Sequence, residues 1–249
     1  PWIAAVEACL AAPWTRIEDE SMTRGVASAD QLLWLVWRLG DSRDPSALPV
    51  LRRVLALEKD DAKFLDRAAV AALQCAGPAR RQLLLEMLAS KHLEVVRPAL
   101  VAQEQRTDAE LRDRTRDAVL RLGETLDHVT AVFAERDEPD RIALALAVLD
   151  SDRFARFTGD LCTAALKVIG QAKDVRYLPQ LARGVRHPNS GVRSSAAMAL
   201  GNTFAREAAP HLLEMLKDDS EVVRQAAQKG LDDLANYLDA RAKWEARLK

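Results

Sequence analysis

The sequence predicts an all-α protein: a right-handed α-solenoid in which about 13 or 14 helices stack as antiparallel pairs. A stretch near the C-terminus repeats at an offset of 31, so that Pro179, Val192 and Arg193 recur as Pro210, Val223 and Arg224. Apolar residues make up 49% of the chain but aromatic residues only 5%, and the apolar share consists mostly of Ala and Leu, which are good helix formers. A period of this length indicates a helix-pair repeat, because one pair cannot bury its apolar face without its neighbours.

Apolar periodicity and turn residues place the helices along the chain. They are expected near residues 2–11, 28–39, 44–57, 61–76, 79–89, 93–105, 108–122, 125–135, 139–150, 154–169, 174–186, 190–200, 205–217 and 220–247. The connections between them are short, so successive helices should run antiparallel.

Helix ends follow from capping residues. Asp44 with Pro45 should open the helix over 44–57, since Asp accepts an orphan backbone N–H and Pro fits the first helical position. Asp174 should open the helix over 174–186 in the same way. Residues 187–190 form a predicted turn, and Gly201 is expected to end the following helix in a left-handed cap.

The repeat signature extends beyond its clearest copies. Residues 40–51 match 170–181 at an offset of 130, and residues 84–88 match 212–216 at an offset of 128. We therefore expect a single solenoid over 1–249 with no strong domain boundary. Its predicted parts are a Trp-rich N-terminal cap (1–40), repeats (41–105), degenerate repeats (106–160), and the clearest repeats with a C-terminal cap helix (161–249).

Charge and cysteine content limit the function classes. The formal net charge is -1, and residues 1–125 carry 18 basic and 19 acidic side chains, so general nucleic-acid binding gains no support. Cys9, Cys75 and Cys162 are far apart and odd in number, which disfavours a disulfide framework or a metal knuckle and favours a cytoplasmic location. No apolar stretch approaches the length of a transmembrane helix, so no membrane span is expected. The chain starts at Pro1, which leaves a removed N-terminal segment open.

Residues 174–201 and 205–231 resemble the short HEAT-like repeats, an armadillo-like fold, of the kind that also occurs in phycobilin lyases. The matching pattern is an Asp-started first helix with Leu-Pro, an Asp/Pro turn, and then Val-Arg-x-x-Ala-x-x-Ala-Leu-Gly. Residues 40–51 and 83–97 match parts of this pattern, whereas residues 100–160 match it poorly. The resemblance implies that the second helix of each pair lines a concave surface.

Two rows of variable residues, each spaced by 31, flank the apolar stripe of the second helices. The candidate partner-binding residues in these rows are Thr163, Ser194 and Gln225, and Lys167, Met198 and Lys229. The resemblance implies that they face the groove, and the alternative is ordinary solvated helix surface.

Four of the five tryptophans, Trp2, Trp14, Trp34 and Trp37, fall at or before position 37. Trp34 and Trp37 are further candidates for a partner-binding surface, because Trp is favoured at interaction hot spots. The alternative is an N-terminal cap, with at least one of these two side chains in the core.

Arg97, Arg193 and Arg224 share one motif position. They form either a basic row for a ligand or, as the resemblance implies, an internal ladder in which each Arg reaches an acidic or carbonyl group of an adjacent unit.

The leading functional hypothesis is a non-enzymatic scaffold that binds a protein or peptide on the curved solenoid surface. No catalytic constellation, cofactor loop or metal motif is recognised; the four histidines are scattered, and none is followed by the Glu of the iron-dependent HEAT-repeat hydroxylases. Two alternatives stay open: a phycobilin-lyase-like enzyme or chaperone, and a nucleic-acid-binding helical-repeat protein. The sequence leaves the oligomeric state open.

Overall fold

The computed structural model describes residues 2–11, 29–56, 62–127, 129–134 and 136–247. Within these ranges the chain forms fourteen α-helices and seven short 3-10 helices, and no strand. It divides into two compact units, the N-terminal unit Pro1–Ala118 and the C-terminal unit Val119–Lys249. Each is described by itself, and a single solenoid over both stays a prediction. Trp14 lies outside the described residues.

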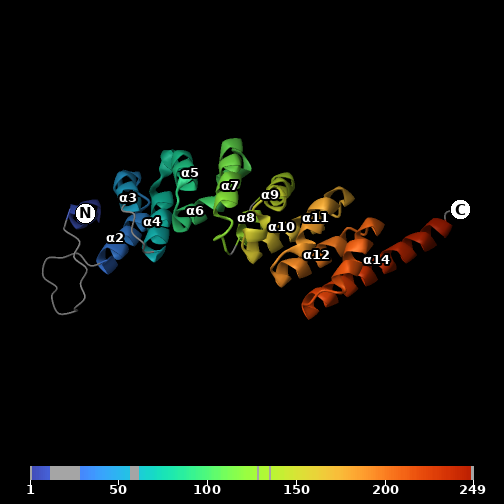
Figure 1. Cartoon of the computed structure of the whole chain (residues 1–249). Coiled ribbons are helices and arrows are strands. Elements are labelled where there is room, and N and C mark those ends of the chain that lie inside the picture. The colour runs from blue at the N-terminus through green and yellow to red at the C-terminus, as the bar shows by residue number, and fades with distance from the viewer. Residues whose placement is uncertain (1, 12–28, 57–61, 128, 135, 248–249) are drawn as a thin grey trace. The chain divides into compact units, whose positions relative to one another are not determined.

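The N-terminal unit consists of two layers of helices (Figure 1). Helices α2 (Ala29–Ser42), α4 (Ala62–Cys75) and α6 (Leu93–Leu100) pack side by side in one layer. Helices α3 (Leu48–Leu55) and α5 (Arg80–Ala89) cover α4 and α6 from the other layer, and α1 (Trp2–Ala11) packs against α2 and α3. Helix α7 (Ala109–Leu122) contains the boundary between the units.

The C-terminal unit repeats this plan. Helices α10 (Gly159–Gln171), α12 (Ser190–Asn202) and α14 (Glu221–Arg247) form the layer of second helices. Helices α9 (Glu138–Asp150), α11 (Leu178–Arg183) and α13 (Ala209–Met215) pack against them, and the short α8 (Thr130–Ala134) contacts α9 and α10. This stack of helix pairs confirms the predicted all-α repeat architecture.

Every predicted helix overlaps one observed α-helix, but several of the predicted helices were too long, such as 174–186, whose α-helix spans Leu178–Arg183. The helix expected over 125–135 spans only Thr130–Ala134. The helix expected over 93–105 ends at Leu100, and a 3-10 turn follows at Gln103–Arg106. The side-chain amide of the buried Gln105 donates to Ala99 O, and this bond stabilises the early end of the helix because it helps to satisfy a terminal carbonyl.

The predicted caps are present, but they open short 3-10 turns that lead into the α-helices. Asp44 Oδ1 accepts the backbone N–H of Ser46 at 2.9 Å, and Pro45 is the first residue of its turn. Asp174 Oδ1 accepts the N–H of Arg176 at 2.9 Å. Both caps therefore act at the start of the first helix of a repeat, as expected.

The prediction that Gly201 ends its helix in a left-handed cap was wrong. Gly201 lies inside α12, and a Cβ placed there would come 2.7 Å from Gly230 Cα of α14. Gly170 of α10 likewise faces Ala199 of α12, with 2.8 Å between the added Cβ and Ala199 Cα. These glycines allow close approach of neighbouring helices. Among the described residues other than glycine, positive φ angles occur three positions after Gly40, Gly170 and Gly201, at Arg43, Lys173 and Phe204.

The apolar stripe predicted for the second helices forms the core of the C-terminal unit. Val192, Ala196 and Leu200 of α12 are fully buried, as are Val223 and Ala227 at the same positions of α14. Cys75 and Cys162 are buried free thiols within helices. No helix among the described residues is long and apolar enough to cross a membrane.

Candidate functional site

The layer of second helices in the C-terminal unit brings the predicted rows together. Helix α10 carries Thr163 and Lys167, α12 carries Met198, and α14 carries Gln225 and Lys229. Since α12 packs between α10 and α14, positions related by the repeat lie on neighbouring helices. The rows thus run across three adjacent helices.

The row formed by Lys167, Met198 and Lys229 is exposed and has an apolar residue at its centre. Lys167 and Lys229 are exposed, and Met198 between them keeps 49% of its surface accessible. Gln225 is exposed and Thr163 is partly covered. An unbranched, polarizable Met side chain adapts to differently shaped partners, so this row suits contact with another chain.

The prediction that Ser194 belongs to an exposed row was wrong, because Ser194 is only 7% exposed. Ser194, Ala197 and Gly201 follow one another along one edge of α12, and that edge faces α14 at Gly230. The equivalent Gln225 is exposed because α14 is the last helix that the structure describes. Ser194 is thus covered by the next repeat, whereas Gln225 is not.

Two row residues already have partners on their own helix. Lys229 Nζ lies 2.7 Å from Asp233 Oδ2, and Gln225 Nε2 donates to Glu221 Oε1 at 2.9 Å. Such exposed pairs contribute only about 0.3–0.5 kcal/mol. A partner that offers better contacts can therefore displace them at little cost.

A hollow of about 420 Å³ adjoins the row beside Thr163 and Lys167. Helices α8, α9 and α10 line it with Phe133, Ala134, Arg141, Asp160, Thr163, Ala164, Lys167, Val168 and Gln171. Phe133 and Val168 are buried, so the inner wall is apolar.

Charges of both signs, from Arg141, Asp160 and Lys167, surround this apolar wall. This arrangement suits one inserted apolar side chain flanked by polar groups, which is the pattern of a protein contact. Sequence reasoning found Thr163 and Lys167 but missed Phe133 and Arg141. Those two lie in the degenerate repeats, where no repeated position marked them.

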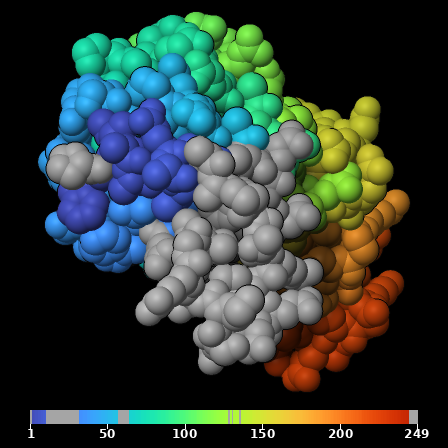
Figure 2. Space-filling model, turned by 90° about the vertical axis from the view of Figure 1, so that its left-hand side faces the viewer, coloured from blue at the N-terminus to red at the C-terminus, as the bar shows by residue number. Residues whose placement is uncertain are grey.

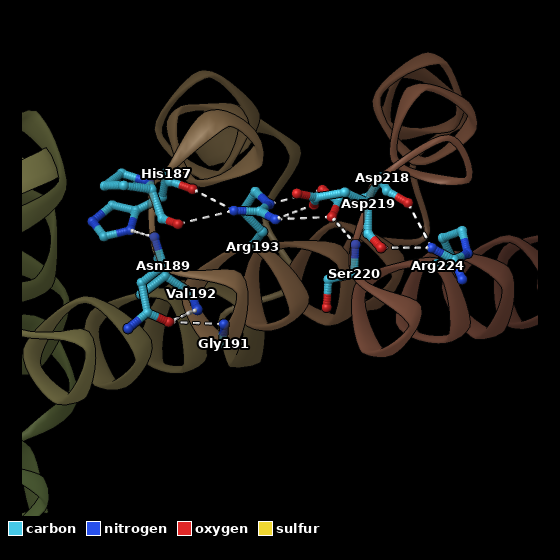
Figure 3. A network of polar contacts seen from close by, with 10 residues as sticks. His187, Asn189, Gly191, Val192, Arg193, Asp218, Asp219, Ser220 and Arg224 are labelled. Carbon is cyan, nitrogen blue, oxygen red and sulfur yellow. Dashed lines mark hydrogen bonds and ion pairs between the residues drawn. The ribbon is translucent and has the colours of Figure 1, made fainter.

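Arg193 belongs to an internal ladder and is not part of the exposed surface (Figure 3). Its guanidinium binds Asp218 of the next turn through two hydrogen bonds, Nε to Oδ2 at 2.7 Å and Nη2 to Oδ1 at 2.9 Å. It also donates to Asp219 Oδ1 at 2.8 Å and to the carbonyls of His187 and Pro188 at 3.0 and 3.1 Å. The guanidinium lowers the pKa of Asp218 to about 2 through these hydrogen bonds. The structural interpretation of Arg193 is confirmed.

Arg224 repeats part of this pattern. It donates to the carbonyls of Asp218 and Asp219 at 2.8 and 3.0 Å. Both carbonyls belong to the turn before its own helix, so this ladder position is structural as well.

Cys162 and His187 form a buried pair that resembles a catalytic dyad but lacks its chemistry. Cys162 Sγ lies 3.7 Å from His187 Nε2, and both side chains are buried. Burial raises the pKa of Cys162 to about 12, and burial also lowers the pKa of His187. A neutral thiol beside a neutral imidazole is a poor nucleophile, because the thiolate is the reactive form.

His187 instead links two repeats. Its Nδ1 accepts the N–H of Asn189 at 3.1 Å, which places the ring proton on Nε2, 3.3 Å from Phe154 O. Among the described residues, no group of three or more His, Cys, Asp or Glu side chains is arranged to hold a metal ion.

The N-terminal unit presents a different surface. Trp34 and Trp37 of α2 are 50% and 47% exposed, so the expectation that at least one lies in the core was wrong. Helix α2 buries Leu35 and Val36 instead, which leaves the neighbouring Trp positions at its edge. Arg38 was not among the predicted surface residues, although the spacing of 34, 37 and 38 places these residues on adjoining faces of one helix.

Residues 160–232 match the family model of HEAT repeats. This range begins near the start of α10 and ends within α14, so it contains both predicted rows. No curated protein matches the chain.

Several solved structures match the chain at low similarity. Human deoxyhypusine hydroxylase in complex with glycerol is 20% identical, with 84% of this chain and 81% of that chain covered and a TM-score of 0.39. An engineered protein is 15% identical over 94% of this chain and 68% of its own, with a TM-score of 0.40. A designed armadillo repeat protein is 14% identical over 94% and 100%, with a TM-score of 0.28. These values carry no argument about activity.

Proposed function

This chain is a HEAT-repeat protein, and we propose that it is a non-enzymatic scaffold that binds a protein partner on the second helices of its C-terminal unit. The observation that carries the proposal is the hollow of about 420 Å³ beside the exposed row on α10, α12 and α14. The rows lie inside the range that matches HEAT repeats.

The chemistry of the surface defines the partner. An apolar side chain of the partner enters the hollow, and a second apolar group covers Met198. Acidic groups of the partner lie near Lys167, which has no ion pair with another described residue. A short amphipathic helix meets these requirements, because residues three or four apart point the same way.

Paired substitutions test the proposal. Met198 is 49% exposed on α12 and Leu213 is 54% exposed on α13, so Met198→Asp and Leu213→Asp add the same charge to opposite layers of one unit. We expect wild type and Leu213→Asp to capture the same protein in affinity purification with mass spectrometry, and Met198→Asp to bind that protein at least about tenfold more weakly.

Three outcomes contradict the proposal. One is repeated failure to recover a partner, and another is a partner lost with Leu213→Asp but kept with Met198→Asp. The third is a covalent change in the partner, such as a bilin adduct after incubation with bilin and an acceptor apoprotein. Lys167→Glu provides a second readout, since it should weaken the binding of an acidic partner without removing the apolar contact.

A further inference from the structure

Three tryptophans surround one arginine at the surface of the N-terminal unit. Arg38 Cζ lies 5.5 Å from the ring centroid of Trp2, 5.9 Å from that of Trp34 and 5.7 Å from that of Trp37. Trp2 and Trp34 meet edge to face with centroids 5.2 Å apart. Helix α1, which carries Trp2, lies against α2 and α3 at the surface of this unit (Figure 2). We name Trp2, Trp34, Trp37 and Arg38 the Trp–Arg surface.

The guanidinium of Arg38 has no carboxylate partner among the described residues. Its Nε is buried and has no hydrogen-bond partner, and Arg38 forms no ion pair with another described residue. Asp41 lies one helical turn away and does not pair with it. Aromatic faces attract the cation but accept no strong hydrogen bond, so the rings do not satisfy the N–H donors of Arg38.

This combination of groups restricts the ligand. A purely apolar partner would bury the charge of Arg38 without an acceptor, which is costly. A cationic ligand would be repelled, since Arg38 already occupies the aromatic faces. A carboxylate fits the planar fork of the guanidinium with two parallel hydrogen bonds, and the surrounding rings exclude water from them.

We propose that the Trp–Arg surface binds a protein segment in which one Asp or Glu is flanked by apolar side chains. The carboxylate pairs with Arg38, and the flanking side chains cover the three tryptophans, each of which is 36–50% exposed. Tryptophan and arginine together are among the residue types most enriched at binding hot spots.

The local charge favours a single carboxylate over a polyanion such as nucleic acid. Helices α1 and α2 contain one basic residue, Arg38, and three acidic residues, Glu7, Asp30 and Asp41. A strand of phosphates would meet repulsion from the acidic residues and gain only one cation. A partner with one acidic residue gains the pair with Arg38 without that penalty.

The inference is independent of the surface proposed for the C-terminal unit. The two surfaces share no residues, and one centres on the apolar Met198 whereas the other centres on the charged Arg38. Either binding proposal can therefore be disproved without the other. Met198→Asp must leave binding at the Trp–Arg surface unchanged.

A library of random dodecapeptides displayed on phage, selected against the full chain, tests the inference. We expect enriched peptides to carry Asp or Glu beside aromatic or aliphatic residues. For a synthetic version of such a peptide, Arg38→Gln should raise Kd about tenfold or more, and Arg38→Lys about threefold, because lysine keeps the charge but loses the fork. The same peptide with its acidic residue changed to the amide should lose affinity equally, and the two changes together should cost no more than either alone.

Arg53→Gln is the matched control, since it removes an exposed arginine from α3 of the same unit. Circular dichroism checks that Arg38→Gln and Trp37→Ala retain the helical fold. The inference is overturned if no selected peptide depends on Arg38, or if the dependent peptides are basic or lack an acidic residue. It is also overturned if a fluorescent oligothymidylate binds more tightly than any peptide, or if Trp37→Ala abolishes self-association of the chain.

Discussion

Two successive contacts between repeats use the same positions with different chemistry. In the first contact, Cys162 of α10 meets His187 of the turn before α12. In the second, one repeat further along the chain, Arg193 of α12 meets Asp218 of the turn before α14. The first contact is neutral and buried, and the second is an ion pair with side chains 14% and 11% exposed. The repeat therefore keeps a cross-link between units but not its chemical nature.

Arg224 shows what the cross-link adds. Arg193 and Arg224, at equivalent positions of successive repeats, both donate to two carbonyls of their own turns. Only Arg193 also reaches the carboxylates of a following turn. An arginine of this motif thus has two roles. Its bonds to carbonyls order its own turn, and its bonds to carboxylates join two repeats.

The largest expected effect concerns the contact between α12 and α14, the two helices joined by the second cross-link. Gly201→Val places a Cβ 2.7 Å from Gly230 Cα, and backbone cannot move aside as a flexible side chain can. We expect a loss of about 3 kcal/mol or more in the free energy of unfolding, measured by urea denaturation.

Gly191→Val is the control in the same helix. An added Cβ at Gly191 meets only Asn189 Oδ1, at 3.1 Å, so the loss should not exceed about 1 kcal/mol. Equal losses from the two variants would show that close packing of α12 on α14 is not the reason for Gly201.

The next largest effect on stability distinguishes the arginine that joins two repeats from the arginine that bonds only within its own turn. Arg193→Met removes the contacts with Asp218 and Asp219 and leaves the mostly buried Asp218 without its cation, so we expect a loss of about 2–3 kcal/mol. Arg224→Met removes only hydrogen bonds to two carbonyls and should cost about 1 kcal/mol or less.

Urea denaturation of both variants gives the comparison, and a cycle with Asp218→Asn isolates the pair. If Arg193→Met and Arg224→Met cost the same, the ion pair between repeats contributes no net stability.

The helices and the ladder could be predicted from the sequence because their signals lie within one helix or one turn. Capping by Asp44 and Asp174 and the stripe through Val192 and Ala196 need only local spacing. The role of Gly201 and the burial of Ser194 depend on how closely the next helix approaches, which no periodicity within α12 reveals.

The candidate surfaces were predicted only in part, because they too depend on how separate helices pack against one another. The spacing of 31 located Thr163 and Lys167, but the opposite wall of the hollow comes from Phe133 and Arg141 in unrepeated sequence. At the N-terminal unit, Trp34 and Trp37 were recognised by composition. Their exposure depends on which face of α2 packs into the unit, since Leu35 and Val36 are buried in their place, and composition does not reveal this.

The smallest expected effect distinguishes the two cross-links by pH. Burial lowers the pKa of His187 below its ordinary value of 6.5, so the unfolded chain binds this proton first on acidification. The neutral cross-link therefore loses stability as the pH falls below about 6.5. Asp218 has an ordinary pKa of 3.8 that Arg193 lowers to about 2, so the ionic cross-link is intact above about pH 5 and loses stability between about pH 5 and pH 2.

Both cross-links lose stability on acidification, but they do so in different pH ranges. Urea denaturation at a series of pH values resolves the two ranges. His187→Gln should flatten the dependence near pH 6 and leave the lower window intact, whereas Asp218→Asn should flatten only the lower one. Asp219→Asn, at a neighbouring carboxylate whose side chain is 91% exposed, should preserve both windows. If His187→Gln left the dependence near pH 6 unchanged, the buried imidazole would not titrate differently in the folded and unfolded chain, and the neutral cross-link would not respond to pH. If instead Asp218→Asn and Asp219→Asn flattened the lower window equally, the effect would belong to the general charge of the turn and not to the pair that joins the repeats.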